Sequence, residues 1–455
     1  MEGARAVDVP SVFTLLKVGF GPSSSHTMGP YAAARDFRNL VAEAGPPGGR
    51  LRVVLLGSLA LTGRGHLTDA AVAAGLGGYD LNRGSPPLPE VLAAVRAAGA
   101  VTVAGCPVAF CPDRDIVFDV SERDLPHPNT LRFELRGDDG RVLLGEEYRS
   151  LGGGAVAGGT FGDAPAVKGR FTMAEVLAAC REGGTDLAGF VRANEGALGL
   201  APSEVGARLS ALWEAMRDSI ARGLSTGGDL PGPLALARRA PGLYRALQGR
   251  PKASLAWEMD LASVYAIAVG EENAAGGRVV TAPTCGASGV LPAVLRVLQE
   301  RLGLPDERVH GALLVAGLIG LAVAANASIA GAEVGCQGEV GTASAMAAAA
   351  ACYLLGGDPE AQVDRAAETA LEHYLGLTCD PVYGLVQIPC IERNGAAAVA
   401  ALHAASLALL AQGEDRISFD TAVAAMAEIG RDMNPKYRET ARGGLAGQFR
   451  PEPRG

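Results

Sequence analysis

Three cysteines, Cys336, Cys379 and Cys390, stand in short segments rich in glycine, proline and acidic residues. Cys336 lies in the segment GAEVGCQGEVG, Cys379 in LTCDP and Cys390 in IPCIERN. Thiolates are the ligands that soft metal centres prefer, and glycine lets a backbone pass close to a bulky group. Three thiolates on a four-metal cluster would leave one metal open to a substrate. The pattern predicts a metal centre that performs Lewis-acid chemistry.

Spacing alone leaves other interpretations of the cysteines open. A lone cysteine usually serves as a small core side chain, and we assign that role to Cys106, Cys180 and Cys352. The closely spaced cysteines of ferredoxins are not present in this sequence. Zinc held by three cysteines and one histidine is the alternative. His373 precedes Cys379 by six residues and is the candidate for the histidine ligand, although it falls on a helical face.

Three of the six histidines stand in loop-like segments of the first third of the chain. They are His26, His66 and His127, and their neighbours are mainly glycine, serine, threonine and proline. Imidazole changes its charge near neutral pH, so a histidine can take a proton from a substrate. Because catalytic side chains are more often carried by loops than by helix faces, these three are the candidates for proton transfer.

A hydroxyl-rich segment, residues 21–30 (GPSSSHTMGP), precedes a helical run. Its hydroxyl groups belong to Ser23, Ser24, Ser25 and Thr27. Hydroxyls and backbone N–H groups at the start of a helix favour an anion, so the segment is suited to a carboxylate. An elaborate helix cap without a ligand is the alternative interpretation.

A second segment of small residues, 281–292 (TAPTCGASGVLP), opens another helical run and could bind a carboxylate or an amine. Thr284, Cys285 and Gly286 lie at its centre. Cys285 has no histidine or lysine next to it that would activate the thiol as a nucleophile. We therefore interpret it as a small residue beside the substrate.

Lysine is scarce, with four in the whole chain. A pyridoxal-phosphate enzyme needs a Schiff-base lysine and a glycine-rich phosphate loop. Lys252 is the only plausible candidate, and no clear phosphate loop accompanies it. The sequence therefore does not favour pyridoxal chemistry.

The composition indicates a globular protein of two domains. At 455 residues and 48% hydrophobic content, the chain exceeds the size at which single cores usually stop growing. The net charge is −9 and there is no run of lysine and arginine, so we expect no nucleic-acid partner. The N-terminus has no apolar signal core, which favours the cytoplasm. Eight cysteines in such a chain indicate thiols or metal ligands rather than disulfides.

One uncharged stretch, residues 311–332, is long enough to span a bilayer. It lacks aromatic belts and basic flanks, and it runs directly into the Cys336 segment. We therefore expect a buried core helix and no membrane partner.

The pattern along the chain predicts an α+β protein with an N-terminal α/β domain over 1–150, a glycine-rich linker over 151–170 and an all-helical domain over 171–455. Strand-length apolar runs and a GDDG turn indicate a mixed sheet in the first domain. The expected strands are 51–56, 115–120, 131–135 and 142–148, with helices at 29–44 and 89–98. The expected later helices are 172–182, 203–223, 253–272, 289–302, 308–331, 342–355, 359–374, 394–412 and 419–431.

Taken together, these segments resemble the iron–sulfur L-serine dehydratase (L-serine ammonia-lyase) family in its single-chain form. The matching motifs follow family order over nearly the whole chain, and those around the three cysteines are very specific. The motifs lie at 23–30, 63–69, 127–129, 271–284, 328–341, 379–394 and 441–446.

The resemblance implies a [4Fe–4S] cluster on Cys336, Cys379 and Cys390, a homodimer, and conversion of L-serine to pyruvate and ammonia. It implies that His66 or His127 removes the α-proton, while His26 positions the substrate. The sequence does not rank the two candidate bases. The hydroxyl loop and residues 284–286 would hold the substrate's carboxylate and amine.

One departure from the family pattern concerns the C-terminus. Some single-chain members end in a cysteine that folds back to cap the open iron, whereas this sequence has no cysteine after Cys390. We therefore expect water, a small anion or the substrate as the fourth ligand. Two functions of other classes stay open, a zinc-dependent hydrolase or structural zinc protein and a non-catalytic amino-acid sensor.

Overall fold

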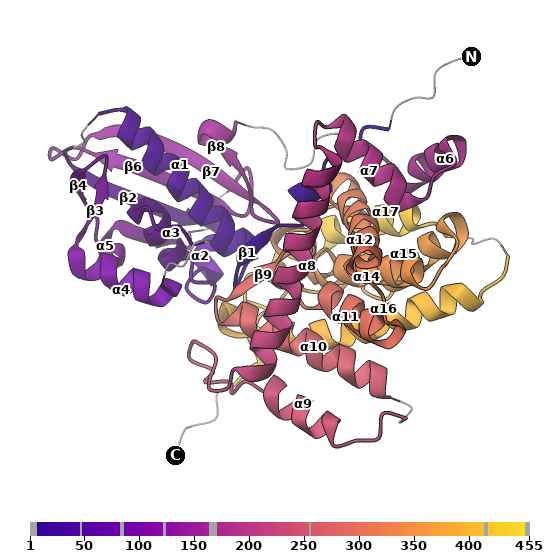
Figure 1. Ribbon diagram of the computed structural model, residues 1–455. Coiled ribbons are helices and arrows are strands. Elements are labelled where there is room, and N and C mark those ends of the chain that lie inside the picture. The colour runs from indigo at the N-terminus through magenta and orange to yellow at the C-terminus, as the bar shows by residue number, and fades with distance from the viewer. Residues whose placement is uncertain are drawn as a thin grey trace, which may run out of the picture.

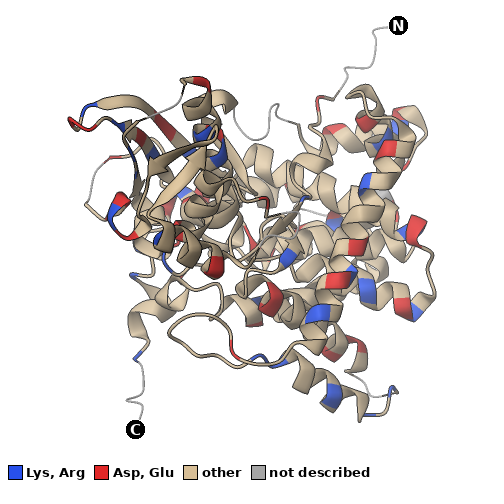
Figure 2. Cartoon of the chain, turned by 60° about the vertical axis from the view of Figure 1, so that its left-hand side comes forward, with Lys and Arg blue, Asp and Glu red and all other residues tan. Residues whose placement is uncertain are grey.

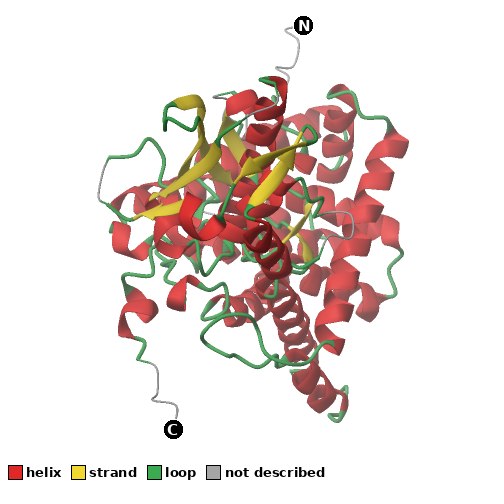
Figure 3. Cartoon of the chain, turned by 90° about the vertical axis from the view of Figure 1, so that its left-hand side faces the viewer, coloured by secondary structure: helices red, strands yellow, loops and turns green. Residues whose placement is uncertain are grey.

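The computed structural model describes residues 7–45, 48–81, 86–121, 124–162, 171–253, 256–413 and 417–450. These residues form two bodies that lie side by side (Figure 1). The strands gather in the N-terminal body, and the rest is almost entirely helical (Figure 3). Lys and Arg residues alternate with Asp and Glu residues along the outer elements of both bodies (Figure 2). The predicted α+β class, with a mixed-sheet domain before a helical domain, is confirmed.

A seven-stranded mixed sheet is the framework of the first domain. Its strand order is β3-β4-β2-β6-β7-β8, and β5 also pairs with β2. The central strand β2 runs parallel to β4 and β5 and antiparallel to β6. The strands are β2 (Arg50–Leu56), β3 (Ala100–Val103), β4 (Cys106–Ala109), β5 (Ile116–Asp119), β6 (Thr130–Arg136), β7 (Val142–Gly152) and β8 (Ala155–Gly158). The short strands β3, β4 and β8 were not among the expected ones.

Helices cover this sheet and bury its apolar side chains. Phe37 of α1 stacks on Phe133 of β6, with ring centroids 5.3 Å apart, and both side chains are fully buried. A short helix, α2, follows β2 without a connecting loop, so the strand's register sets where α2 carries Ser58 and Thr62. The helices of this domain are α1 (Gly29–Glu43), α2 (Gly57–Thr62), α3 (Thr68–Gly77), α4 (Leu88–Ala98) and α5 (Pro112–Asp115).

The glycine-rich segment expected as a linker begins inside the sheet. Strand β7 continues to Gly152, and β8 folds back to pair with it. Gly152, Gly153 and Gly154 all have positive φ angles, which glycine adopts readily, and this allows the tight reversal. Residues 163–170 of the expected linker lie outside the described residues. The division at 151–170 stays a prediction.

The second domain packs long helices around a core dominated by small side chains. Every residue of α14 except Tyr353 is buried, and its many alanines let α12 and α16 approach closely. The principal helices are α6 (Met173–Gly183), α7 (Leu187–Ala197), α8 (Pro202–Ser225), α9 (Ala240–Gln248), α10 (Trp257–Ala274), α11 (Val290–Leu302), α12 (Asp306–Asn326), α14 (Val340–Leu354), α15 (Asp364–Glu372), α16 (Cys390–Leu410) and α17 (Phe419–Asp432). Helices α7 and α9 were not expected from the sequence.

Helix α12 is long and apolar enough to cross a membrane by length and composition, yet 78% of its apolar window is buried inside the protein. It ends at Asn326, five residues before the expected end, because the Asn326 side chain caps carbonyls of Ala322 and Phe171 and Ala327 leaves the helical conformation. That the chain has no membrane partner stays a prediction.

The N-terminal segment of the chain belongs to the helical body. Val12 and Leu16 are buried in the helical core, and the Val12 N–H donates to the Glu195 carboxylate at 2.8 Å. Strand β1 (Val18–Phe20) then pairs antiparallel with β9 (Arg278–Val280). Among the described residues, the expected all-helical character of the second domain has one exception, the three-residue strand β9 that pairs with the N-terminal segment.

Helix α8 provides a matched pair of glycines that tests this packing. A Cβ atom on Gly223 would lie 2.2 Å from the Ala268 carbonyl oxygen of α10, whereas a Cβ on Gly206 would meet no atom within 4 Å. We expect Gly223→Ala to lower the free energy of unfolding by about 1–3 kcal/mol through overpacking. Gly206→Ala should raise it by about 0.5–1 kcal/mol through helix propensity. Urea unfolding followed by circular dichroism measures both, and equal effects would contradict the close approach of α8 and α10.

Candidate active site

The three cysteines converge from three separate segments, two of them at the N-terminal ends of helices. Cys336 lies in a single 3-10 turn, Gly335–Gln337, between α13 (Gly331–Val334) and the start of α14. Cys390 is the first residue of α16. Cys379 lies in extended backbone that forms a bridge with Arg438 near the C-terminus. All three line one enclosed cavity and are at most 9% exposed.

Two helix N-termini and the Arg393 guanidinium bring positive charge to these thiols, while Glu339 stands close to two of them. The N-termini of α14 and α16 carry the positive ends of the helix dipoles, which favour thiolates. A hydrogen bond with Cys379 lowers the pKa of Cys336 to about 6, and the Arg393 guanidinium acts in the same direction. The hydrogen bond to Cys336 and burial raise the pKa of Cys379, and burial together with the charge on Cys336 raises the pKa of Cys390. These opposite shifts are consistent with one negative charge shared by the hydrogen-bonded Cys336–Cys379 pair.

This donor set suits a soft metal centre. Three thiols converge in one buried cavity, and a bound cation supplies the positive charge that several thiolates need at close range. One ligand atom each of Cys336, Glu339 and Cys379 lies within 4.8 Å of the others. The cavity is lined by Pro22, Ser23, His66, Gly286, Cys336, Glu339, Val340, Cys379, Pro381, Val386, Cys390 and Glu439. It thus joins the thiols to the histidine loops of the first domain.

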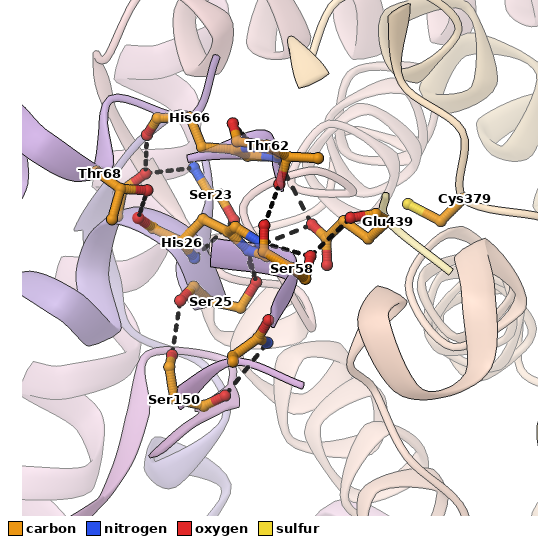
Figure 4. Close-up of polar contacts among 12 residues, drawn as sticks. Ser23, Ser25, His26, Ser58, Thr62, His66, Thr68, Ser150, Cys379 and Glu439 are labelled. Atoms are coloured by element: carbon orange, nitrogen blue, oxygen red, sulfur yellow. Dashed lines mark hydrogen bonds and ion pairs between the residues drawn. The ribbon is translucent and has the colours of Figure 1, made fainter. Parts of the chain in front are cut away.

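The hydroxyl-rich loop reaches this cavity from the first domain. It forms a short π-helix, Ser24–Met28, that runs directly into α1. Ser23 lines the cavity and caps the π-helix, since its Oγ accepts a hydrogen bond from the His26 N–H at 3.1 Å. Ser24 and Ser25 are buried beneath it. The loop therefore presents hydroxyl groups at the domain junction (Figure 4).

His66 points its free ring nitrogen at the cavity. Its Nδ1 lies 3.0 Å from the Thr62 carbonyl oxygen, which can only accept, so Nδ1 carries the proton of the neutral ring. Nε2 is then unprotonated and carries a lone pair, and it lies 3.6 Å from Oε1 of Glu439. Burial lowers the pKa of His66 to about 4, although the hydrogen bond with Thr62 opposes this. Thr27 fixes the loop by donating to the His66 carbonyl at 2.7 Å.

His26 has both ring nitrogens engaged (Figure 4). The single hydroxyl proton of Ser58 is donated to the Glu439 carbonyl oxygen at 2.6 Å. Ser58 Oγ must therefore accept from His26 Nε2 at 2.9 Å, which leaves Nδ1 to accept from the Ser25 hydroxyl. Burial and the neighbouring His66 ring, 4.5 Å away between centroids, hold the pKa of His26 low.

His127 lies apart from the thiol cavity. Its Nδ1 accepts from the Asn129 N–H at 3.0 Å, so the neutral ring carries its proton on Nε2, which lies 3.2 Å from Glu333 Oε1. Burial alone would raise the pKa of Glu333, but its contacts with His127 and Ser328 lower it. This pair stands beside a second cavity of about 910 Å³ whose walls come from both domains and include Ser58 and Glu333.

Known protein families match both domains of this chain. A family model described as "Serine dehydratase beta chain" matches residues 11–160, and one described as "Serine dehydratase alpha chain" matches residues 161–446. The chain belongs to the serine dehydratase family. The resemblance inferred from the sequence motifs is thereby confirmed.

Curated members of the serine dehydratase family resemble this chain over nearly its full length. "L-serine dehydratase 2" of Escherichia coli (strain K12) is 44% identical, and "L-serine dehydratase" of Streptomyces coelicolor is 45% identical. Both alignments cover 96% of this chain and 98% of the relative. "L-serine dehydratase" of Helicobacter pylori (strain J99) is 39% identical, with the same coverage.

The small-residue segment expected to bind substrate is divided between the cavity and the core. In this member of the serine dehydratase family Gly286 lines the cavity, and Thr284 is buried beside Glu339. Burial and the Cys336 sulfur raise the pKa of Glu339 to about 8. Cys285 does not line the cavity, and its Sγ lies 3.5 Å from Met28 Sδ. Burial raises the pKa of the Cys285 thiol.

Four polar residues at the site were not singled out from the sequence. Glu339 and Arg393 lie inside the quoted cysteine motifs of the serine dehydratase family, so those motifs could have drawn attention to them. Ser58 and Glu439 stand in segments without a local signal, and only the fold brings them to the histidines. His373, the histidine considered as a zinc ligand, is exposed on α15 and bonds the Thr369 carbonyl, away from the thiols.

Proposed function

We propose that this chain is an L-serine dehydratase that converts L-serine to pyruvate and ammonia, with a [4Fe–4S] cluster held by Cys336, Cys379 and Cys390. The observation that carries the proposal is one buried cavity lined both by the three thiols and by His66. Such a cluster would supply an open iron that acts as a Lewis acid toward the β-hydroxyl of serine, which is otherwise a poor leaving group.

The hydrogen bonds made by the ring nitrogens of the three histidines support His66 as the base that removes the α-proton. In the neutral rings, the lone pair of His26 is taken by the Ser25 hydroxyl, and that of His127 by the Asn129 N–H. Nε2 of His66 keeps its lone pair and faces the cavity. A base must be unprotonated and within reach of the proton it removes. We therefore favour His66 over His127 and assign His26 to holding the hydroxyl loop in place.

The remaining groups around the cavity suit the rest of the substrate. Ser23 of the hydroxyl loop and Gly286 line the cavity, with Thr284 buried nearby, and these positions are suited to holding the carboxylate. Loss of the α-proton and the hydroxyl yields aminoacrylate and water. Aminoacrylate then tautomerises to an imine that hydrolyses to pyruvate and ammonia. Because the cavity is enclosed, the thiols and His66 act away from bulk solvent.

Anaerobic purification followed by metal analysis tests this proposal directly. We expect about four irons and four sulfides per chain, a cluster absorption band that L-serine perturbs, and pyruvate formation from L-serine. Tightly bound zinc without iron would point to the zinc hydrolase or structural zinc protein. Serine binding without ammonia release would point to the amino-acid sensor. Either result would overturn the proposal.

Several finer properties of this enzyme also stay predictions. We expect a homodimer that works in the cytoplasm, with L-serine as its small-molecule substrate and with neither nucleic acid nor membrane as a partner. Size-exclusion chromatography with light scattering would test the dimer.

A further inference from the structure

The cavity contains a buried carboxyl group that has no assigned role. Glu439 is 4% exposed and lines the cavity with the three cysteines and His66. Its Oε2 is buried and has no hydrogen-bond partner among the residues that the structure describes. A buried carboxyl oxygen without a partner is costly, so its position indicates that a ligand completes it.

The backbone around Glu439 holds the side chain in place at some cost. Its φ angle is +55°, in the left-handed region that side chains other than glycine rarely adopt. Three hydrogen bonds keep the segment there. The Glu439 N–H donates to the Cys379 carbonyl, the Cys379 N–H donates to the Tyr437 carbonyl, and Ser58 donates to the Glu439 carbonyl. Strain of this kind persists where the surroundings enforce it, and it is found most often at functional sites.

The position of Glu439 relative to His66 indicates which substrate group it meets. Oε1 of Glu439 lies 3.6 Å from Nε2 of His66 and 3.5 Å from Nδ1 of His26. In L-serine, the α-hydrogen and the α-ammonium are bonded to the same carbon atom. A substrate that presents its α-hydrogen to His66 Nε2 therefore places its ammonium within reach of a group beside that nitrogen.

We propose that Glu439 binds the α-ammonium group of the substrate and makes the enzyme select 2-amino acids over the matching acids without an amino group. This inference rests on the proposed function, since it takes L-serine as the substrate and His66 as the base. A charge-assisted hydrogen bond in an enclosed cavity gives both affinity and discrimination, because a ligand without the ammonium leaves the carboxyl group unpaired.

The other carboxyl group of the cavity is less suited to this role. Glu339 Oε2 lies 3.9 Å from Cys336 Sγ and 3.8 Å from Cys379 Sγ, so it stands among the proposed metal ligands. Arg393, the cation beside the thiols, is directed to the Thr378 carbonyl and Asp380. A cationic substrate group beside Glu439 would balance negative charge on the histidine side of the cavity.

A comparison of two ligands tests the role of Glu439. 3-Hydroxypropanoate differs from L-serine only in lacking the amino group. With anaerobic holoenzyme in a His66→Gln background, which should bind L-serine but turn it over too slowly to consume it during a titration, calorimetry should show that the protein with Glu439 intact, the wild type at this position, prefers L-serine. In Glu439→Gln the affinity for L-serine should fall about 10- to 100-fold, while that for 3-hydroxypropanoate changes less than about threefold. Glu439→Asp keeps the charge and should keep part of the preference.

Glu339→Gln is the matched control, since it removes the other carboxyl group of the same cavity. It should change the affinities for both ligands by a similar factor and keep the preference for L-serine. The inference is overturned if Glu439→Gln keeps the wild-type preference, or if Glu339→Gln alone removes it. If Glu439→Gln does not fold, an unchanged preference in Glu439→Asp, whose carboxyl group is drawn back by one methylene, also overturns it.

Iron and sulfide analysis of the same samples separates this inference from the proposed function. Wild-type protein without a cluster overturns the proposed function, and calorimetry still reports the ligand preference. Wild-type protein with a cluster whose serine preference survives Glu439→Gln overturns only the role of Glu439.

Discussion

Replacing His66 with glutamine is expected to slow pyruvate formation from L-serine by about 10²- to 10⁴-fold, the usual contribution of a positioned base. Glutamine fills similar space but cannot take up the α-proton. Binding of L-serine should survive, because the proposed role of His66 Nε2, whose ring is held by Thr62, is to take up the reacting hydrogen and not to hold the substrate. Coupled pyruvate assays measure turnover, and deuterium uptake into residual L-serine in D₂O measures α-proton removal by itself.

His127→Gln is the matched control for this experiment. His127 contacts Glu333 at the larger cavity and does not line the thiol cavity, so turnover should fall less than about tenfold, below the effect of a missing base. The reverse ranking of the two variants would show that our choice of base is wrong.

The pH profile gives an independent measure of the same assignment. Burial lowers the pKa of His66 to about 4, so the ring stays unprotonated through the neutral range. Protonation of His66 should therefore reduce kcat/KM only when the pH falls toward 4. A histidine with the ordinary pKa of 6.5 would already reduce it near pH 6.5. Glu439 and His26 also face this nitrogen, and burial raises the pKa of Glu439 while lowering that of His26. An acid limb that disappears in His66→Gln would identify His66 as its source.

Replacing Cys336 with serine is expected to remove both the proposed cluster and the activity. A serine hydroxyl is a poor ligand for a soft metal, and Cys336 is the thiol whose pKa is lowered, to about 6. Iron content should fall from about four per chain toward zero in anaerobic preparations, and pyruvate formation should fall below detection. Inductively coupled plasma analysis and absorption spectroscopy measure the loss.

Cys352→Ala provides the control for a buried thiol outside the site. Cys352 lies within α14, the helix that begins shortly after Cys336. Its side chain is buried in the helical core and does not line the thiol cavity. This variant should keep its iron and its turnover. A Cys336→Ser protein that retains full iron content would exclude Cys336 as a ligand.

The sequence was most informative where function is concentrated in short motifs. Cys336, Cys379 and Cys390 stand out because glycine, proline and acidic neighbours are unusual for core cysteines. The long alanine-rich helices were also predictable, since their composition persists over many turns. Strands of three or four residues such as β3, β4 and β9 were not, because so few residues establish no period and their pairing depends on distant partners.

The ranking of the histidines could not be obtained from the sequence. It depends on which atoms donate the hydrogen bonds that run from His26 to Ser58 and from Ser58 to the Glu439 carbonyl. Ser58 and Glu439 are 381 positions apart in the sequence. Glu439 itself resembles any charged residue of a C-terminal segment. The backbone pairing of Cys379 with residues 437–439, together with the hydrogen bond from Ser58, brings it to the cavity.

The pairing of β1 with β9 sets an order of events during synthesis. Residue 18 leaves the ribosome long before residue 280, its partner, has been made. At about 5–20 residues per second the delay is roughly 15–50 seconds. The sheet of the first domain can form during that time, but the hydroxyl loop that follows β1 stays without its final anchor. We therefore expect the nascent chain to complete the cavity that holds the three thiols only after the segment carrying Glu439 has emerged from the ribosome.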